Sequence, residues 1–225
     1  MTQRPQAVSL ILSRLFCDVS PLIVGIVVIS AVLDAQNGSV HRHHTAPPAN
    51  AEASPTAVSV LKIPDVTLLD QHGKKVRFYT DLIKGKVVAI NTIFTTCTTI
   101  CPLMGANFYK LRKILENDVT GKVRLISISI DPVVDTPERL EQWSKNFGPV
   151  EPGWTLLTGS KEDVDSLLKA LQVFTSEKQD HAPVVLIGDS SGNWSRASAL
   201  LPPSHLAELI HSRLGLMASH TLPGL

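Results

Sequence analysis

The chain has 225 residues, 44% of them hydrophobic and 18% charged, with a formal net charge of +1 at pH 7. This length and composition predict one globular domain of ordinary size plus an additional segment. A net charge so close to zero gives no electrostatic basis for binding nucleic acid, so we exclude nucleic acid as a partner. The cysteines, Cys17, Cys97 and Cys101, are too few for a disulfide scaffold.

Residues 1–35 have the pattern of a signal peptide or an N-terminal membrane anchor. Arg4 and Arg14 precede the apolar run PLIVGIVVISAVL at residues 21–33. This run is short for a membrane-spanning helix, which needs about 20 residues, and suits the apolar region of a signal peptide. We therefore expect export to the periplasm or to the outer face of the cytoplasmic membrane. Whether the segment is cleaved or kept as an anchor at residues 21–33 stays open.

Residues 36–59 are rich in Ala, Ser, Pro and Asn, which is typical of a flexible linker. The linker contains His41, His43 and His44, a cluster that can collect a divalent metal but would lose conformational entropy in doing so. A solvated tail is the simpler interpretation of these three histidines. The folded domain is expected at residues 60–215, followed by a C-terminal tail at residues 216–225.

Near-continuous apolar runs at residues 86–94 and 122–130 predict strands buried on both faces. A third strand is predicted at residues 183–188, and a fourth after a turn at residues 192–194. Helices are predicted after Pro102, from a cap at Thr136, from a capping box at Ser160, and near Ser204. This alternation predicts an α/β fold with a mainly parallel sheet covered by helices.

Cys97 falls in the loop that leaves the first buried strand, and Cys101 falls at the start of the next helix. The N-terminus of a helix supplies free N–H groups and partial positive charge, which stabilise a thiolate. A thiolate can attack a disulfide or bind a metal. Dithiol redox motifs usually have two residues between the cysteines. One more residue gives the two sulfurs room for one soft ion such as Cu(I), so a third ligand is expected elsewhere.

The candidate third ligands are His72, His181, His205 and His211. His72 lies in a turn pattern, DQHGK, and His205 and His211 belong to the last predicted helix. His181 directly precedes the strand at residues 183–188. It reaches the end of the sheet where Cys97 lies only if that strand runs antiparallel to the strand before Cys97. Taken alone, the residues leave His181 as a candidate ligand.

Four stretches together resemble the Sco (SenC) proteins, membrane-tethered copper chaperones: CTTICP, SIDPVVDTPERLEQW, WTLLTGS and DHAPVVLIGDSSG. The resemblance covers about residues 60–209. It implies a thioredoxin-like fold with a central mixed sheet flanked by helices, in which the strand after His181 is antiparallel. It also implies a site for Cu(I) or Cu(II) made by Cys97, Cys101 and His181.

The family helps to deliver copper to the binuclear copper site of cytochrome c oxidase, or prepares the cysteines of that site. The resemblance therefore implies that the partner is the copper-receiving subunit of this oxidase or another copper protein. It also matches Asp131 and Asp135 to acidic positions of the family. We expect Asp135 to cap a helix and Asp131 to form a turn or support the site.

The chain departs from the family pattern at several positions. Thr98 stands where a proline is common, Thr99 where an acidic residue is frequent, and Leu186 where an aromatic residue is usual. Pro183 resembles the cis-proline beside the active site of thioredoxin-like reductases, and only this resemblance suggests a cis bond. These departures concern metal affinity and the choice of partner more than the fold.

An enzyme is the second hypothesis: a thiol–disulfide oxidoreductase in which Cys97, the more exposed thiol, attacks and Cys101 resolves the mixed disulfide, or the reverse. That reaction needs both cysteines and little from His181, whereas the copper site needs all three residues. A sensor of copper or redox state is a third hypothesis, which would require a signalling partner. The sequence has no phosphate-binding glycine motif, zinc-protease helix or serine-nucleophile pattern.

Overall fold

A computed structural model of the chain describes residues 56–58, 60–118 and 121–221. The predicted signal or anchor at residues 1–35 lies outside the described residues, as do His41, His43, His44 and most of the predicted linker. None of the helices in the described part of the chain combines the length and the hydrophobicity needed to cross a membrane.

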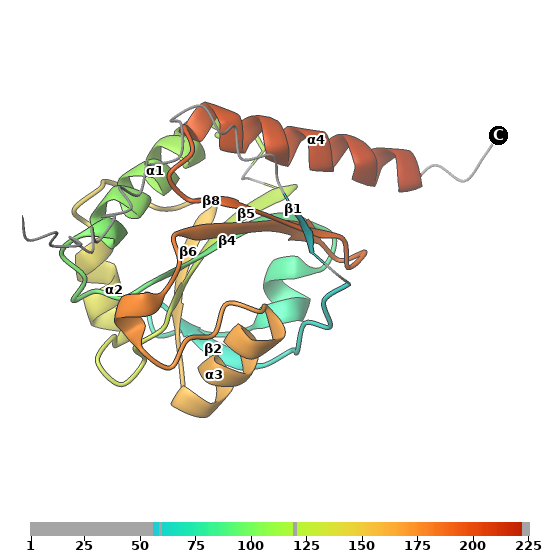
Figure 1. Ribbon diagram of the computed structural model, residues 1–225. Coiled ribbons are helices and arrows are strands. Elements are labelled where there is room, and N and C mark those ends of the chain that lie inside the picture. The colour runs from blue at the N-terminus through green and yellow to red at the C-terminus, as the bar shows by residue number, and fades with distance from the viewer. Residues whose placement is uncertain (1–55, 59, 119–120, 222–225) are drawn as a thin grey trace, which may run out of the picture. The chain divides into compact units, whose positions relative to one another are not determined.

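The described strands form one mixed sheet in the order β1-β8-β7-β4-β5-β6-β2-β3 (Figure 1). Their bounds are β1 Thr56–Val58, β2 Thr67–Asp70, β3 Lys75–Arg77, β4 Val87–Ile93, β5 Val123–Ser129, β6 Trp154–Thr158, β7 Val184–Asp189 and β8 Trp194–Ser198. Strands β4, β5 and β6 are parallel, whereas β7 is antiparallel to β4 and β8 is antiparallel to β7. The mixed sheet implied by the resemblance is confirmed.

The mainly parallel sheet predicted from the alternation of strands and helices is wrong, because only the central three strands are parallel. The short connections from β2 to β3 and from β7 to β8 are hairpins, which can join only antiparallel strands. The strand after His181 therefore runs in the direction that brings its first residues to the end of the sheet where β4 finishes.

Helices cover both faces of this sheet, as expected, with α1 and α4 on one face and α3 on the other (Figure 1). Their bounds are α1 Ile100–Ile114, α2 Pro137–Ser144, α3 Lys161–Ala170 and α4 Pro203–Thr221, with a π-helical turn, η1, at Phe78–Ile83 and a 3-10 turn, η2, at Lys178–Asp180. One core packs under α1, α2 and α4, and a second packs under α3 and η1.

The two helix starts for which a capping residue was predicted, at Thr136 and Ser160, show the expected capping hydrogen bonds. Thr136 accepts a hydrogen bond from the N–H of Arg139 at 3.4 Å, with Pro137 at the first position of α2. Ser160 accepts from the N–H of Asp163 at 3.1 Å, and its hydroxyl donates to the carboxylate of Asp163 at 2.6 Å. These caps satisfy N–H groups that the first turn of a helix leaves without a partner.

Two elements extend beyond the bounds expected for the domain. Strand β1 lies in the stretch assigned to the linker and pairs with β8 through Thr56 and its neighbours. Helix α4 continues past Gly215 to Thr221, into the stretch assigned to the tail. A glycine inside a helix costs only about 1 kcal/mol relative to alanine, which is too little to end a helix that packs against α1.

Candidate metal centre

Cys97 and Cys101 occupy different depths at the end of β4. Cys97 lies in the turn after the strand, where its N–H donates to the carbonyl of Phe94 at 3.2 Å. Cys101 is the second residue of α1 and is fully buried, whereas 9% of Cys97 is exposed. Both are free thiols in the structure. The prediction that Cys97 is the more exposed of the two is therefore confirmed.

The start of α1 makes Cys97 unusually acidic for a cysteine. Burial works against ionisation of this thiol, but it is outweighed by hydrogen bonds from the N–H groups of Cys101 and Thr99 and from the Thr99 hydroxyl. Together these donors lower the pKa of Cys97 to about 7. The Thr99 oxygen lies 3.6 Å from the sulfur. A large fraction of Cys97 is therefore thiolate at neutral pH.

Cys101 has the opposite environment. Burial against the core under α1 raises its pKa to about 12, and the neighbouring charges of Cys97 and Asp135 act in the same direction. A hydrogen bond from the backbone N–H of Phe94 opposes this shift without cancelling it. Cys101 therefore holds its proton at neutral pH unless a cation replaces it.

His181 reaches the cysteines from the far side of the site, at the end of η2 and just before β7. Its Nδ1 lies 3.1 Å from the carbonyl oxygen of Lys178, and since a carbonyl only accepts, Nδ1 carries the hydrogen. Its Nε2 lies 3.8 Å from Sγ of Cys101. The edge of the ring meets Phe94, with 5.4 Å between the ring centroids. The nitrogen that faces the sulfur is therefore the one with a free lone pair.

Burial lowers the pKa of His181, although the hydrogen bond to Lys178 opposes the shift. The ring is therefore neutral at neutral pH, which is the form that binds metals. A hydrogen bond from the second ring nitrogen to a carbonyl is the arrangement that usually orients a metal-binding histidine.

Cys97 and His181, which are both largely buried, line the same hollow of about 310 Å³. Cys101 lies behind them. The other residues that line the hollow are Phe94, Thr96, Thr98, Thr99, Ile100, Lys178 and Gln179. The three predicted ligands are thus brought to one place.

They are not closed around a common point, because no group of three His, Cys, Asp or Glu side chains among the described residues is gathered tightly enough to hold a metal as it stands. The donor set nevertheless fits a soft ion: two sulfurs, one already acidic, and one neutral imidazole nitrogen directed at the inner sulfur.

The other candidate histidines lie elsewhere. His72 pairs with Glu151, with 3.2 Å between Nε2 and Oε1, and His211 pairs with Asp118 at 3.0 Å. His205 lies in the first turns of α4. None of the three lines the hollow beside Cys97, so of these four candidates, all within the described residues, His181 is the one that shares a site with the cysteines.

The expectation that Asp135 caps a helix is wrong, because Thr136 is the cap of α2. Asp135 is fully buried and joins the loop after β4 to the end of β5 instead. Its carboxylate accepts from the N–H and the hydroxyl of Thr95 at 3.1 and 2.5 Å, and from the hydroxyl of Ser129 at 2.6 Å. Asp131 does open a turn, as expected, since its carbonyl accepts from the N–H of Val134 at 3.0 Å.

Sequence reasoning missed three residues that shape the site: Thr99, Phe94 and Lys178. Thr99 could have been found, because a hydroxyl two positions after a cysteine in a helix-start turn can reach the sulfur. Phe94 looked like part of a buried strand. Lys178 gave no sequence signal at all, since its partner Asp131 lies far away in the chain.

The Ala182–Pro183 bond is trans, and the cis peptide bond found in the described residues is Glu151–Pro152. The cis bond suggested by the resemblance to reductases is therefore absent at Pro183. Leu186, where an aromatic residue is usual, is buried in the core under α3.

Comparison with known proteins now adds to this geometry. The SCO1 protein homolog of Bacillus subtilis is 33% identical over 121 residues, which are 53% of this chain and 61% of that protein. A Stutzerimonas stutzeri protein named "Putative copper-binding protein" is 31% identical over 109 residues, 48% of this chain and 51% of that protein. The chain thus spans less than two thirds of the length of either relative.

Among solved structures, BsSco is described as a member of the Sco family of cytochrome c oxidase assembly proteins with a disulfide switch. It superposes with a TM-score of 0.60 at 25% identity and covers 72% of this chain and 98% of its own. The fold is therefore thioredoxin-like. A family model described as SCO1/SenC matches residues 59–206, well over half of the chain. This chain belongs to the SCO1/SenC family.

Proposed function

We propose that this protein is a copper chaperone that binds one copper ion as cargo through Sγ of Cys97, Sγ of Cys101 and Nε2 of His181. One observation carries the proposal. The imidazole of His181 is fixed through Nδ1 so that its free nitrogen faces the inner sulfur, 3.8 Å away, beside the hollow lined by Cys97.

Copper suits these donors better than the harder metals do. Two thiolates are the preferred ligands of Cu(I), and a neutral imidazole extends the site to Cu(II). The low pKa of Cys97 supplies one thiolate at neutral pH, and a bound cation would displace the proton of Cys101. A carrier with this donor set can hold copper in either oxidation state.

We propose that the recipient is the binuclear copper site of cytochrome c oxidase, and that residues 1–35 export the domain to the periplasmic side of the membrane. The similarity to BsSco, a member of a family of oxidase assembly proteins, supports this recipient. The apolar run at residues 21–33 supports the location, since its length suits the apolar region of a signal peptide.

The test is copper binding by the reduced, anaerobic chain, with His41, His43 and His44 replaced by alanine in every sample so that the N-terminal cluster cannot contribute. Cys97→Ala, Cys101→Ala and His181→Ala are compared with His72→Ala, which removes a histidine outside the hollow. We expect one tightly bound copper, greatly weakened in the first three variants and retained in the last. Copper binding that is unchanged in His181→Ala, or no tight copper binding at all, would overturn the proposal.

A second function is favoured by the contrast between the two thiols. Cys97 as thiolate can attack a disulfide of a target, forming a mixed disulfide and releasing one target thiolate. Cys101 then gives up its proton to the released target thiolate and attacks the sulfur of Cys97, which forms the Cys97–Cys101 disulfide and releases the second target sulfur as a thiolate. A reductase of this kind would prepare cysteines of a copper site before they receive the metal. It would keep its activity in His181→Ala, which separates it from the copper function.

A further inference from the structure

Lys178 contacts the site in three ways. Its carbonyl accepts the hydrogen bond from Nδ1 of His181. Its ammonium group lies 2.6 Å from Oδ2 of Asp131 and 5.5 Å from the centre of the Phe94 ring. Phe94 in turn packs against the imidazole of His181. The main chain of Lys178 therefore orients the imidazole, while its side chain ties the same turn to the end of β5.

Asp131, the partner of Lys178 in the ion pair, is itself held in place by hydrogen bonds. Its N–H donates to the hydroxyl of Ser129 at 3.0 Å, and that hydroxyl donates to the buried carboxylate of Asp135. Asp135 also holds Thr95 in the loop that leads to Cys97. The carboxylate that Lys178 meets is thus anchored to the same network that anchors the cysteine loop, and it is only 16% exposed.

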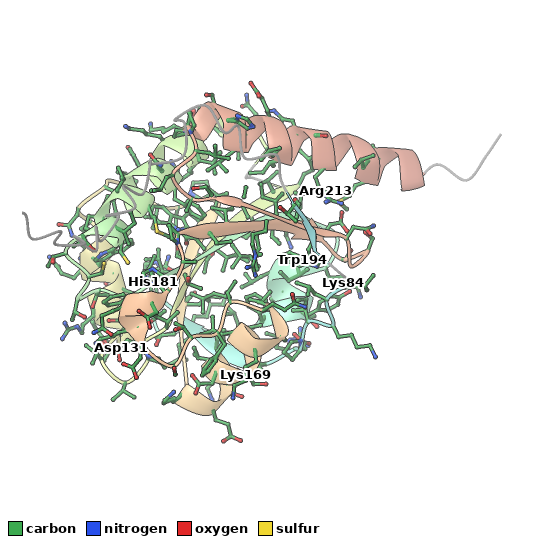
Figure 2. The ribbon with its side chains drawn as sticks, in the orientation of Figure 1. Lys84, Asp131, Lys169, His181, Trp194 and Arg213 are labelled. Atoms are coloured by element: carbon green, nitrogen blue, oxygen red, sulfur yellow. The ribbon has the colours of Figure 1, made fainter. Side chains whose placement is uncertain are left out.

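The segment around Lys178 has few other restraints. Thr175 bonds to the carbonyl of Glu177 within the segment, and the N–H of Asp180 does the same. Of the described side chains at residues 175–180, that of Lys178 is the one tied to another element of the fold. His181 and Asp131 lie at the same end of the sheet (Figure 2). Without the ion pair, the turn that carries the imidazole would depend on its own short-range hydrogen bonds.

We propose that the Lys178–Asp131 ion pair is a latch that positions His181 at the metal site. Because it acts on copper binding, the inference rests on the proposed function and deepens it. Lys178 is a positioning residue that never needs to touch the metal. The latch matters most for Cu(II), because Cu(I) can remain on the two sulfurs when the imidazole is displaced. Opening the latch therefore weakens Cu(II) binding selectively.

The test compares Lys178→Met, which keeps the length of the side chain without its charge, with Asp131→Asn and with the conservative Lys178→Arg. Lys145→Met is the matched control, because it breaks a 3.1 Å ion pair with Glu141 on α2, away from the hollow. Cu(II) affinity and the sulfur-to-copper absorption band are measured for each, and Cu(I) affinity is measured by competition with a chelator.

We expect Lys178→Met and Asp131→Asn to lose about tenfold or more in Cu(II) affinity and to shift the absorption band, as is usual when a residue that orients a ligand is removed. Cu(I) affinity should change much less, Lys178→Arg should restore most of the Cu(II) affinity, and Lys145→Met should behave as the unaltered protein. The ion pair is partly exposed, so thermal stability should hardly change.

A second measurement works without copper. Ring nitrogen spectra of the metal-free protein report whether Nδ1 of His181 keeps its hydrogen bond. We expect a broadened or shifted signal in Lys178→Met and in Asp131→Asn, and an unchanged signal in Lys145→Met. Unchanged ring signals and unchanged Cu(II) binding in Lys178→Met would overturn the latch. If the unaltered protein bound no copper through His181 while the ring signals still responded to Lys178→Met, the proposed function would fail and the positioning of the ring would stand.

Discussion

At the level of single residues, the two thiols of the site are chemically identical, and their surroundings shift their pKa values in opposite directions. Cys97 faces the N–H groups that open α1, and Cys101, the second residue of that helix, faces the core under it. One sulfur is therefore ionised near neutral pH and the other is not. This division serves metal capture and disulfide exchange equally well, since both begin with one exposed thiolate.

The acidity of Cys97 can be tested by alkylation. In the reduced, metal-free protein, the rate of modification of Cys97 by iodoacetamide should rise with pH and reach half its maximum near pH 7, because its pKa is lowered to about 7. Thr99→Val removes a hydrogen-bond donor to the thiolate, so the midpoint should move to higher pH. Mass spectrometry of the modified peptides gives the rate at each cysteine, and Cys101 should stay unmodified throughout.

A midpoint that does not move in Thr99→Val would show that the hydroxyl 3.6 Å from the sulfur does not stabilise the thiolate. Thr98→Val is a suitable control, since Thr98 is exposed and lines the hollow without being a donor to Cys97.

At the level of elements, the site depends on three loops that meet at one end of the sheet: the exits of β4 and β5 and the entry to β7. The apolar runs of these strands were visible in the sequence because each is buried on both faces. The direction of β7 was not, since an apolar run reads the same in either direction. The resemblance supplied that direction, and with it the placement of His181. The latch was invisible because an ion pair between distant residues leaves no local pattern.

Asp135 is a second residue whose role the local sequence pattern did not predict. A carboxylate directly before a Thr-Pro helix start suggests a cap, and Thr136 takes that role. What the sequence could not reveal is that donors of Thr95, in the loop after β4, and of Ser129, at the end of β5, converge on Asp135. Such a convergence depends on the packing of β4 beside β5 rather than on neighbours in the chain.

The hydrogen bonds that Asp135 accepts from Thr95 and Ser129 predict that replacing Asp135 strongly lowers the stability of the protein. Asp135→Ala leaves the buried donor of Ser129 and the half-buried donors of Thr95 without their acceptor, and an unsatisfied buried donor costs about 1–3 kcal/mol. We expect the free energy of unfolding to fall by roughly 2–4 kcal/mol, measured by urea denaturation. Asp135→Asn keeps one acceptor oxygen and should cost less. A variant as stable as the unaltered protein would show that Asp135 does not join the loop after β4 to the end of β5.

At the level of the whole molecule, one sheet separates two cores, and the site belongs to the core under α1, α2 and α4. Close packing of α1 on α2 depends on Gly105, since a Cβ there would lie 2.5 Å from Cζ of Phe147 and 2.8 Å from the Trp143 ring. The site is thus built on a helix whose own position is fixed by the contact of a glycine with two aromatic rings.

Gly105→Ala should therefore lower the free energy of unfolding by about 1–3 kcal/mol, the usual cost of overpacking a core. Gly121→Ala is the control, because a Cβ at that position meets nothing within 4 Å. Thermal or urea unfolding of both variants gives the comparison. Equal stabilities would mean that the aromatic rings of α2 and its following turn move aside without cost.

The antiparallel pairing of β7 with β4 determines when, during synthesis and folding, the three donors of the site come together. Cys97 and Cys101 leave the ribosome together, whereas His181 follows Cys101 by 80 residues and meets it only after β7 has paired with β4. A nascent or unfolded chain therefore offers two thiols and no neighbouring imidazole. The third donor joins them only in a chain that has completed its sheet, so the full donor set is a property of the finished protein and not of its cysteine motif.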